Sequence, residues 1–558
     1  MVKVFLQGTF TMDHFRAIGP QLFYSFPIQV EEREKLDAFL QLLESSQVWK
    51  YLNSKDETGR PAYDQYRLFA VILLGFALGK ASLREIESSC RNDLRFIYIT
   101  GASYPSYVTI SRFIQNVITP NIEQIFACIV KRIFSETQLN MQTVFLDGTK
   151  QEANANKYKF VWKPIHYHQK LSDKVRALLN TLALSANVPA EGILSSKIII
   201  GKLDEAKQIP PENVPGGLKA LNAMRNNLAS YLLKTVEYEE KEAICGPNRN
   251  SYYKTDHDAT AMCLKQDYYS GLGSNMHAAY SVQALVSTGF IVSYLVSQER
   301  SDLKSFQPIL NTFKRMYGYY PKEVGADSGY GNLDNYEYCE KLGIDAYVKY
   351  QAWNGESSGR NPAVYESLAD GSILCLGKRK GYITEIKNRH PKKPGVVFYR
   401  VTGCTGCEFM PYCRRFMSEK TGDEKFFEVQ PRFMQLKQKA RDLLLSPRGI
   451  EMRVNRSCQI EGVFGNIKQN MAYTRFRRTS LERVTVEFAL TCLGLNLRKY
   501  MRFATSGKLP QFWVAPVDLK AEVFKKPSAK RLANRVNKKK KLQPNKVARG
   551  SYKYKRGC

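Results

Sequence analysis

Hydrophobic residues near the carboxyl end of the chain recur with the spacing of one buried helix face. They occupy positions i, i+3, i+4, i+7 and i+11, and they are Ile460, Val463, Phe464, Ile467 and Met471. Glu461 and Lys468 lie beside this stripe, seven residues apart, so about two helical turns bring them onto one face with the bare Gly465 between them. The pattern predicts a carboxylate, a bare patch and an ammonium group in one row, although an ordinary solvated helix face also explains it.

Two earlier segments predict buried strands that end in an aspartate. Residues 143–146 precede Asp147 and Gly148, and residues 323–326 precede Asp327. A helix over residues 333–342 and a strand over 344–348 follow the second segment, which predicts a strand-helix-strand unit. Because such units place functional side chains at the carboxyl ends of parallel strands, both aspartates are candidate site residues. A turn or helix cap is the alternative role for each.

The remaining pattern divides the chain into a core with several additions. Residues 1–135 are expected to be a helical DNA-binding part, in which two helices joined through 101–105 form either a helix-turn-helix-like module or a plain bundle. Residues 136–350 hold the first part of an α/β core, with a helical insertion over 157–250 and a hairpin over 277–296. The acidic run at 255–258 is expected to cap a helix, with metal or DNA contact as its alternative. Residues 351–447 form a Cys-containing insertion of irregular structure, and 448–515 complete the core.

Charge adds a polyanionic partner to this picture. The 558 residues carry a net charge of +31, and nucleic acid fits such a charge because neutralising phosphates releases counterions. The tail, residues 516–558, has 15 Lys or Arg against one Glu from residue 520 onward and is expected to be disordered. The longest apolar run, residues 68–79, is shorter than the roughly 20 residues that span a bilayer. We therefore expect a cytoplasmic protein with no membrane partner.

Three cysteines have the spacing of a zinc knuckle. They are Cys404, Cys407 and Cys413, and Cys375 or His390 could complete a tetrahedral site. The chain has twelve cysteines without a regular framework, which fits a reducing compartment. Structural zinc and reduced thiols in a packed loop domain are the two alternatives.

The three acidic segments together resemble the motifs of DDE transposases from bacterial insertion sequences. The matching stretches are residues 147–149, 326–330 and 461–468, and the text at 456–457, 464–468, 475–478 and 495–499 resembles in particular the group named for element eleven-eighty-two. The wider relatives carry Tyr, two residues, Arg, three residues, Glu, six residues and Lys. Here the spacing from Glu461 to Lys468 fits, while Val454 and Ser457 hold the Tyr and Arg positions and Arg456 lies one residue early.

The resemblance implies a ribonuclease-H-like catalytic core, a mixed sheet with flanking helices, and a transposase that binds element ends, cleaves phosphodiester bonds and transfers strands. Asp147, Asp327 and Glu461 would hold two Mg²⁺ or Mn²⁺ ions. The DNA-binding candidates, among which a Tyr or Arg could stack on an unpaired base, are Lys468, Tyr473, Arg475, Arg477, Arg478 and Arg456. The expected partners are double-stranded DNA at element ends and targets and a second copy of the chain, at the bacterial nucleoid. A nuclease without strand transfer and a catalytically silent DNA-binding protein are the alternatives.

Overall fold

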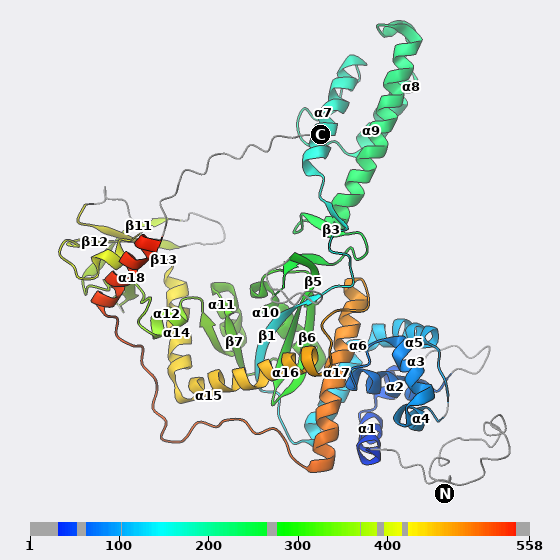
Figure 1. Cartoon of the computed structure of the whole chain (residues 1–558). Helices are drawn as coiled ribbons and strands as arrows, with labels where there is room; N and C mark the ends of the chain where they lie inside the picture. Colours follow the sequence, from blue (N-terminus) through cyan, green and yellow to red (C-terminus); the bar gives the residue numbers. More distant parts are fainter. Residues whose placement is uncertain are drawn as a thin grey trace, which may run out of the picture.

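The computed structural model describes residues 32–52, 63–101, 103–264, 276–368, 370–387, 395–415 and 422–542. Its centre is a six-stranded mixed sheet (Figure 1). The strands are β1 (Thr143–Glu152), β4 (Thr260–Cys263), β5 (Met276–Ser287), β6 (Phe290–Ser297), β7 (Glu323–Gly331) and β8 (Asp345–Tyr350). Strand β1 pairs antiparallel with β5 and parallel with β7, which pairs parallel with β8. The other edge of β5 pairs antiparallel with β6 and β4. The mixed α/β character predicted from the sequence is thus confirmed.

Local sequence explains the two halves of this sheet. The hairpin of β5 and β6 turns at Thr288 and Gly289, both with positive φ, as a tight two-residue connection requires. Strand β7, helix α11 (Leu333–Leu342) and β8 form the predicted strand-helix-strand unit. Helices α10 (Phe306–Tyr317), α14 (Pro431–Leu445) and α17 (Leu481–Ser506) flank the sheet, with α10 and α17 against β6 and α14 against β8.

The amino-terminal region is helical, as predicted. Its helices are α1 (Arg33–Ser45), α2 (Gln65–Ala77), α3 (Leu83–Asn92), α4 (Leu94–Thr100), α5 (Tyr107–Phe113) and α6 (Thr119–Glu136). Helices α1, α2 and α6 pack on α17, so this region and the sheet share one continuous hydrophobic core. A Cβ atom at Gly494 of α17 would lie 2.7 Å from the carbonyl carbon of Phe76, which shows how closely α2 and α17 cross. No helix in the described part of the chain is long and apolar enough to cross a membrane.

A helical arm projects from the sheet between β1 and β4 (Figure 1). It contains α7 (Ile165–Thr181), α8 (Ser196–Lys207) and α9 (Gly217–Cys245), which bury their own small core. The short strands β2 (Phe160–Trp162) and β3 (Ser251–Tyr253) pair antiparallel at the base of the arm. The arm therefore has an apolar core separate from that of the sheet.

The Cys-containing insertion is a regular antiparallel sheet, which corrects the expectation of an irregular domain. Its strands are β9 (Tyr365–Ser367), β10 (Ile373–Cys375), β11 (Lys380–Lys387), β12 (Val396–Val401) and β13 (Lys425–Val429). The runs Val-Val-Phe-Tyr-Arg-Val in β12 and Lys-Phe-Phe-Glu-Val in β13 have the β-branched and aromatic content of strands. The Gly, Pro and Lys content of the surrounding segments led to the prediction of irregular structure.

The expectation of a disordered tail is wrong for part of its length. Residues 529–542 form helix α18 (Ala529–Leu542), which packs on α13 (Met410–Cys413) of the Cys-containing insertion (Figure 1). Leu532 and Val536, one helical turn apart, bury their side chains against Tyr412. Two apolar residues at this spacing suffice to dock a helix whose composition is otherwise basic.

Candidate functional site

The first two predicted acids occupy neighbouring positions on adjacent parallel strands. The ladder between β1 and β7 pairs residues 143–146 with residues 323–326, and its last pair is Leu146 with Ala326. Asp147 and Asp327 are the next residues on the two strands, so their carboxylates meet where the strands diverge. The sequence had suggested that each aspartate ends its strand. Neither does, because β1 continues to Glu152 and β7 to Gly331.

Two other carboxylates, Asp327 and Asp302, act on Asp147 together with the cation Arg456. Burial raises the pKa of Asp147, and the charges of Asp327 and Asp302 raise it further. The N–H of Gly148 and the guanidinium of Arg456 oppose that shift, the latter with its Nη1 3.8 Å from Asp147 Oδ2. The side chain of Asp327 is exposed, and its Oδ1 accepts the N–H of Ser328 at 2.7 Å. Arg456, expected to bind DNA, is thus placed beside an acid of the site.

Gln283, which sequence reasoning missed, lies against Gly148, the residue after Asp147. A Cβ atom at Gly148 would lie 2.2 Å from Gln283 Nε2, so a side chain beside Asp147 would displace the Gln283 amide. The Gln283 amide donates to Asp302 Oδ1 at 3.0 Å, and its carbonyl accepts the hydroxyl of Tyr330 from β7. Side chains from β5, β7 and the turn after β6 therefore meet behind the two acids. No local pattern marks Gln283 or Asp302, because they meet only in the fold.

The third acid lies on a helix that contains two π-helical turns. After α15 (Pro447–Arg456) come η9 (Ser457–Glu461), α16 (Gly462–Gly465) and η10 (Asn466–Asn470), and η9 packs on β1. The predicted stripe is buried at Ile460, Val463 and Ile467, and a Cβ atom at Gly465 would meet nothing within 4 Å. Glu461 is exposed and accepts the Ser457 hydroxyl at 3.1 Å. Among the described residues, no three His, Cys, Asp or Glu side chains are gathered as a metal site, so the structure does not bring Asp147, Asp327 and Glu461 together as one.

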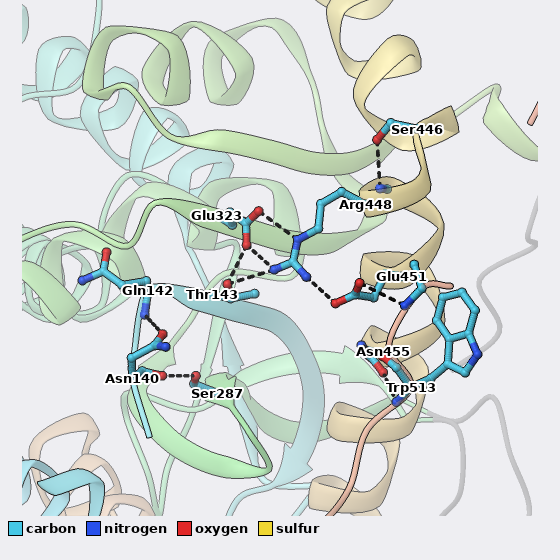
Figure 2. Close-up of polar contacts among 12 residues, drawn as sticks. Asn140, Gln142, Thr143, Ser287, Glu323, Ser446, Arg448, Glu451, Asn455 and Trp513 are labelled. Atoms are coloured by element: carbon cyan, nitrogen blue, oxygen red, sulfur yellow. Dashed lines mark hydrogen bonds and ion pairs between the residues drawn. The ribbon is translucent and has the colours of Figure 1, made fainter. Parts of the chain in front are cut away.

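Arg448 fixes the start of this helical segment to the start of both acid-bearing strands (Figure 2). Its Nε donates to Glu323 of β7 at 3.0 Å, and its Nη2 donates to Thr143 of β1 at 3.2 Å. Thr143 in turn donates to Glu323, and Arg448 also pairs with Glu451 of its own helix. This arrangement positions α15, and with it the segment that bears Glu461, relative to Asp147 and Asp327.

The side chain of Lys468 contacts β1 at the side of the site. Its Nζ donates to Thr149 Oγ1 at 2.6 Å and to the Lys150 carbonyl at 3.2 Å. Thr149 is two residues beyond Asp147 on the same strand. The structure thus brings the predicted Lys468 to the strand of the first acid, where an ammonium group could face a phosphate.

The segment after Lys468 is used mainly for structure. Tyr473 is 4% exposed and lies in the core, so it cannot stack on DNA in this conformation. Arg475 Nε donates to the Ala153 carbonyl at 3.2 Å, and burial lowers the pKa of Arg478 while Glu487 opposes that shift. The Glu487 carboxylate accepts the N–H groups of Arg477 and Arg478, both at 3.0 Å. Of these four DNA-binding candidates, only Arg477 has an exposed side chain.

The acidic run at 255–258 caps a helix, as expected. Asp258 Oδ2 accepts the N–H of Leu481, the first residue of α17, at 2.8 Å. Asp256 accepts the hydroxyl of Tyr280 at 2.8 Å and the N–H of Ser480 at 3.2 Å. Both carboxylates are therefore committed to the start of α17 and its surroundings.

The four candidate zinc-binding cysteines share one neighbourhood. A Cβ atom at Gly377 would lie 2.6 Å from Cys407 Sγ and 3.8 Å from Cys375 Sγ. Burial raises the pKa of Cys413 to about 11, and Cys375, Cys407 and Cys404 act on the same thiol. All four are free thiols, and they do not form a group close enough to hold a metal in the described residues. His390 lies outside the residues that the structure describes.

Two segments match transposase family models. Residues 375–501 match the model described as Transposase DDE domain, and residues 25–116 match the one described as Transposase domain (DUF772). The chain carries a transposase DDE domain with an amino-terminal transposase domain. Glu461, Lys468 and the four cysteines lie inside the DDE-domain match, while Asp147 and Asp327 lie outside both matches. No curated protein and no solved structure matches the chain.

Proposed function

We propose that this chain is a DNA transposase that binds the ends of an insertion sequence, cleaves phosphodiester bonds there and transfers the strands to target DNA. The observation that carries the proposal is the in-register placement of Asp147 and Asp327 where β1 and β7 diverge. Glu461, on a helical segment that packs against β1, is the third acid of the proposed site. The matched transposase models supply the substrate class, DNA.

The strand arrangement supports a ribonuclease-H-like core. If the short β4 is left out and the other strands are numbered in chain order, their spatial order across the sheet is third, second, first, fourth, fifth. Strands one to three pair antiparallel with one another, and strands four and five run parallel to strand one. The proposed acids lie on the first and fourth strands, which are neighbours in space. This topology explains how residues 180 positions apart in the sequence reach one site.

The residues present fit a divalent metal. Asp147 and Asp327 are oxygen ligands, which Mg²⁺ and Mn²⁺ prefer, and their mutual repulsion is the kind of charge that a cation relieves. We assign Asp147 as the residue that would be shared by two ions, with Asp327 and Glu461 each completing one. When bound, two such ions supply the charge that activates a water or 3′-hydroxyl and stabilises the leaving oxygen.

The DNA contacts of this proposal follow from what remains accessible. Lys468 would hold a phosphate beside β1, and Arg477 would extend the contact away from the acids. Arg456 would orient Asp147 until DNA competes for its guanidinium, since a separation of 3.8 Å makes a loose pair. Two copies of the chain acting on the two ends of one element, and membership in the group named for element eleven-eighty-two, belong to the same proposal.

The test uses carboxamide variants of the full chain on DNA from the termini flanking its gene. Asp147→Asn, Asp327→Asn and Glu461→Gln should each lower the cleavage rate by at least about a thousandfold, because each removes a ligand without changing the side-chain volume. Binding measured in Ca²⁺ should change less than about threefold. Asp345→Asn, an exposed acid at the start of β8, is the matched control. Joining of cleaved ends to a target plasmid separates a transposase from a nuclease, and full cleavage by any one variant removes that residue from the site.

We infer that the Cys-containing insertion holds one structural zinc ion, with Cys375, Cys404, Cys407 and Cys413 as ligands. The shared neighbourhood of the thiols supports this, and zinc would draw them to bonding distance as thiolates. Elemental analysis of purified protein should give about one zinc per chain. Less than a tenth of an equivalent, with all four thiols reduced, would show that the insertion folds without zinc.

A further inference from the structure

Four strongly exposed aromatic side chains gather within ten residues at the base of the helical arm. Tyr158, Phe160, Trp162 and Tyr167 are 78%, 43%, 65% and 66% exposed. Scattered single aromatics are common on protein surfaces, whereas a group of them marks a surface that binds something. Together with Lys157, Lys159, Lys163 and Lys170, we call these residues the arm-base patch.

The backbone around the patch holds its rings in place. Phe160 and Trp162 alternate with Val161 on β2, so they share one face, and their rings meet edge to face at 5.5 Å. Strand β2 pairs with the buried strand β3, and the Lys163 N–H donates to the Asn250 carbonyl at 2.8 Å where β2 leads into α7. The exposed face is therefore built on paired backbone rather than on a free loop.

The chain segment that carries these rings has charged residues of one sign. Residues 157–170 contain four lysines and no acidic residue. The Lys157 ammonium lies 5.3 Å from the centre of the Tyr158 ring. A hollow of about 590 Å³ opens beside the rings, within the ~300–1,000 Å³ of ligand-sized pockets, and it is lined by Trp162, Lys163, Ile165, His166, Gln169 and Asn250. Flat apolar rings among lysines match the two chemical parts of a nucleotide strand, its bases and its phosphates.

We propose that the arm-base patch binds unpaired nucleotides of the DNA substrate, with bases stacked on Trp162 and Tyr167 and phosphates held by the lysines. The proposal rests on the proposed function for its choice of DNA. The patch also provides exposed aromatic rings for base stacking. The segment after the third acid does not, because the buried Tyr473 cannot stack on a base. Residues 153–159 connect the patch directly to the end of β1, the strand of the first acid.

The experiment measures binding of the full chain to a fluorescent single-stranded thymidine 20-mer, without divalent metal so that cleavage plays no part. Trp162→Ala and Tyr167→Ala should each raise the Kd by about tenfold, because each removes one stacking platform. Trp162→Phe should restore most of the affinity. Tyr382→Ala is the matched control, since Tyr382 is 65% exposed on β11 and lies outside the patch. Binding to a blunt duplex should change less than about twofold in every variant.

Two outcomes overturn the proposal. The first is single-strand affinity that stays within twofold of the unchanged chain in both alanine variants, with their melting temperatures intact. The second is a shift of the sedimentation profile from dimer to monomer in those variants with unchanged affinity for the 20-mer, which would make the patch an interface between copies of the chain. Neither readout depends on cleavage, so failure of the acid variants to block cleavage would leave this test unaffected.

Discussion

Two charged regions along β1 differ in what surrounds their carboxylates. At Asp147 and Asp327, like charges lie side by side, and Arg456 approaches only to 3.8 Å. At the strap of residues 473–478, the Glu487 carboxylate accepts two backbone N–H groups and lies beside the Arg478 guanidinium. Carboxylates held close to one another mark a candidate site of chemistry, whereas charge that neighbours satisfy marks structure.

The raised pKa of Asp147 also affects the free energy of unfolding. A carboxyl whose pKa is raised in the folded chain binds protons more tightly there than in the unfolded chain. Stability therefore falls as pH rises through the usual pKa of Asp147 toward its raised one, and at neutral pH its charge is a net cost. Asp147→Asn should consequently leave the unfolding free energy unchanged or higher. Burial raises the pKa of Glu487 as well, so the strap differs from the acid pair through the two N–H groups that the Glu487 carboxylate accepts.

The largest stability effect is expected at Glu487. Glu487→Ala leaves two N–H groups without their acceptor and removes the negative charge that acts on the Arg478 guanidinium. Leaving a buried donor without its acceptor costs about 1–3 kcal/mol of unfolding free energy for each group, measurable by urea denaturation. Glu482→Ala, an exposed position in the first turn of the same helix α17, should cost less than about 0.5 kcal/mol. Equal effects of the two substitutions would contradict the structural role of the strap.

Because much of the strap is buried, the next prediction concerns the basic charge of the carboxyl-terminal tail. A chain that ends at Leu542 keeps the docked helix α18 and removes five Lys or Arg. The slope of log affinity against log salt should become shallower by about 0.9 for each phosphate that the shortened chain no longer neutralises. Preference for the element end over random DNA should persist, because flexible Lys and Arg carry no base code. An unchanged slope together with a loss of end preference would make the tail the specificity element.

The smallest effect is expected at the acidic run that the fold uses as a cap. Asp258→Ala removes the acceptor for the Leu481 N–H at the start of α17 and should cost about 1 kcal/mol of unfolding free energy. The cleavage rate, measured where the variant is fully folded, should stay within about twofold. A reduction in cleavage comparable to that of Asp327→Asn would move Asp258 from the structural acids to the catalytic ones.

Local periodicity in the sequence predicted much of the fold and part of the site. Alternation and turn residues predicted the β5–β6 hairpin and the β7–α11–β8 unit, and helical spacing predicted the buried stripe at Ile460, Val463 and Ile467. What failed depended on distant partners. Gly148 and the polar residues after it remain in β1 because β5 pairs with them. Tyr473 is buried beside a helix that begins eight residues later, and a tyrosine fits a surface or a core equally well from sequence alone.

The central claim is that Asp147 and Asp327 together form the metal site for cleavage. The most direct test counts Mn²⁺ ions bound by the full chain in complex with element-end DNA, using the electron paramagnetic resonance signal of the free ion. The account predicts two ions for the unchanged chain, none above background for Asp147→Asn and at most one for Asp327→Asn, with Asp345→Asn retaining two. An Asp147→Asn chain that binds DNA and still holds two Mn²⁺ ions would contradict it.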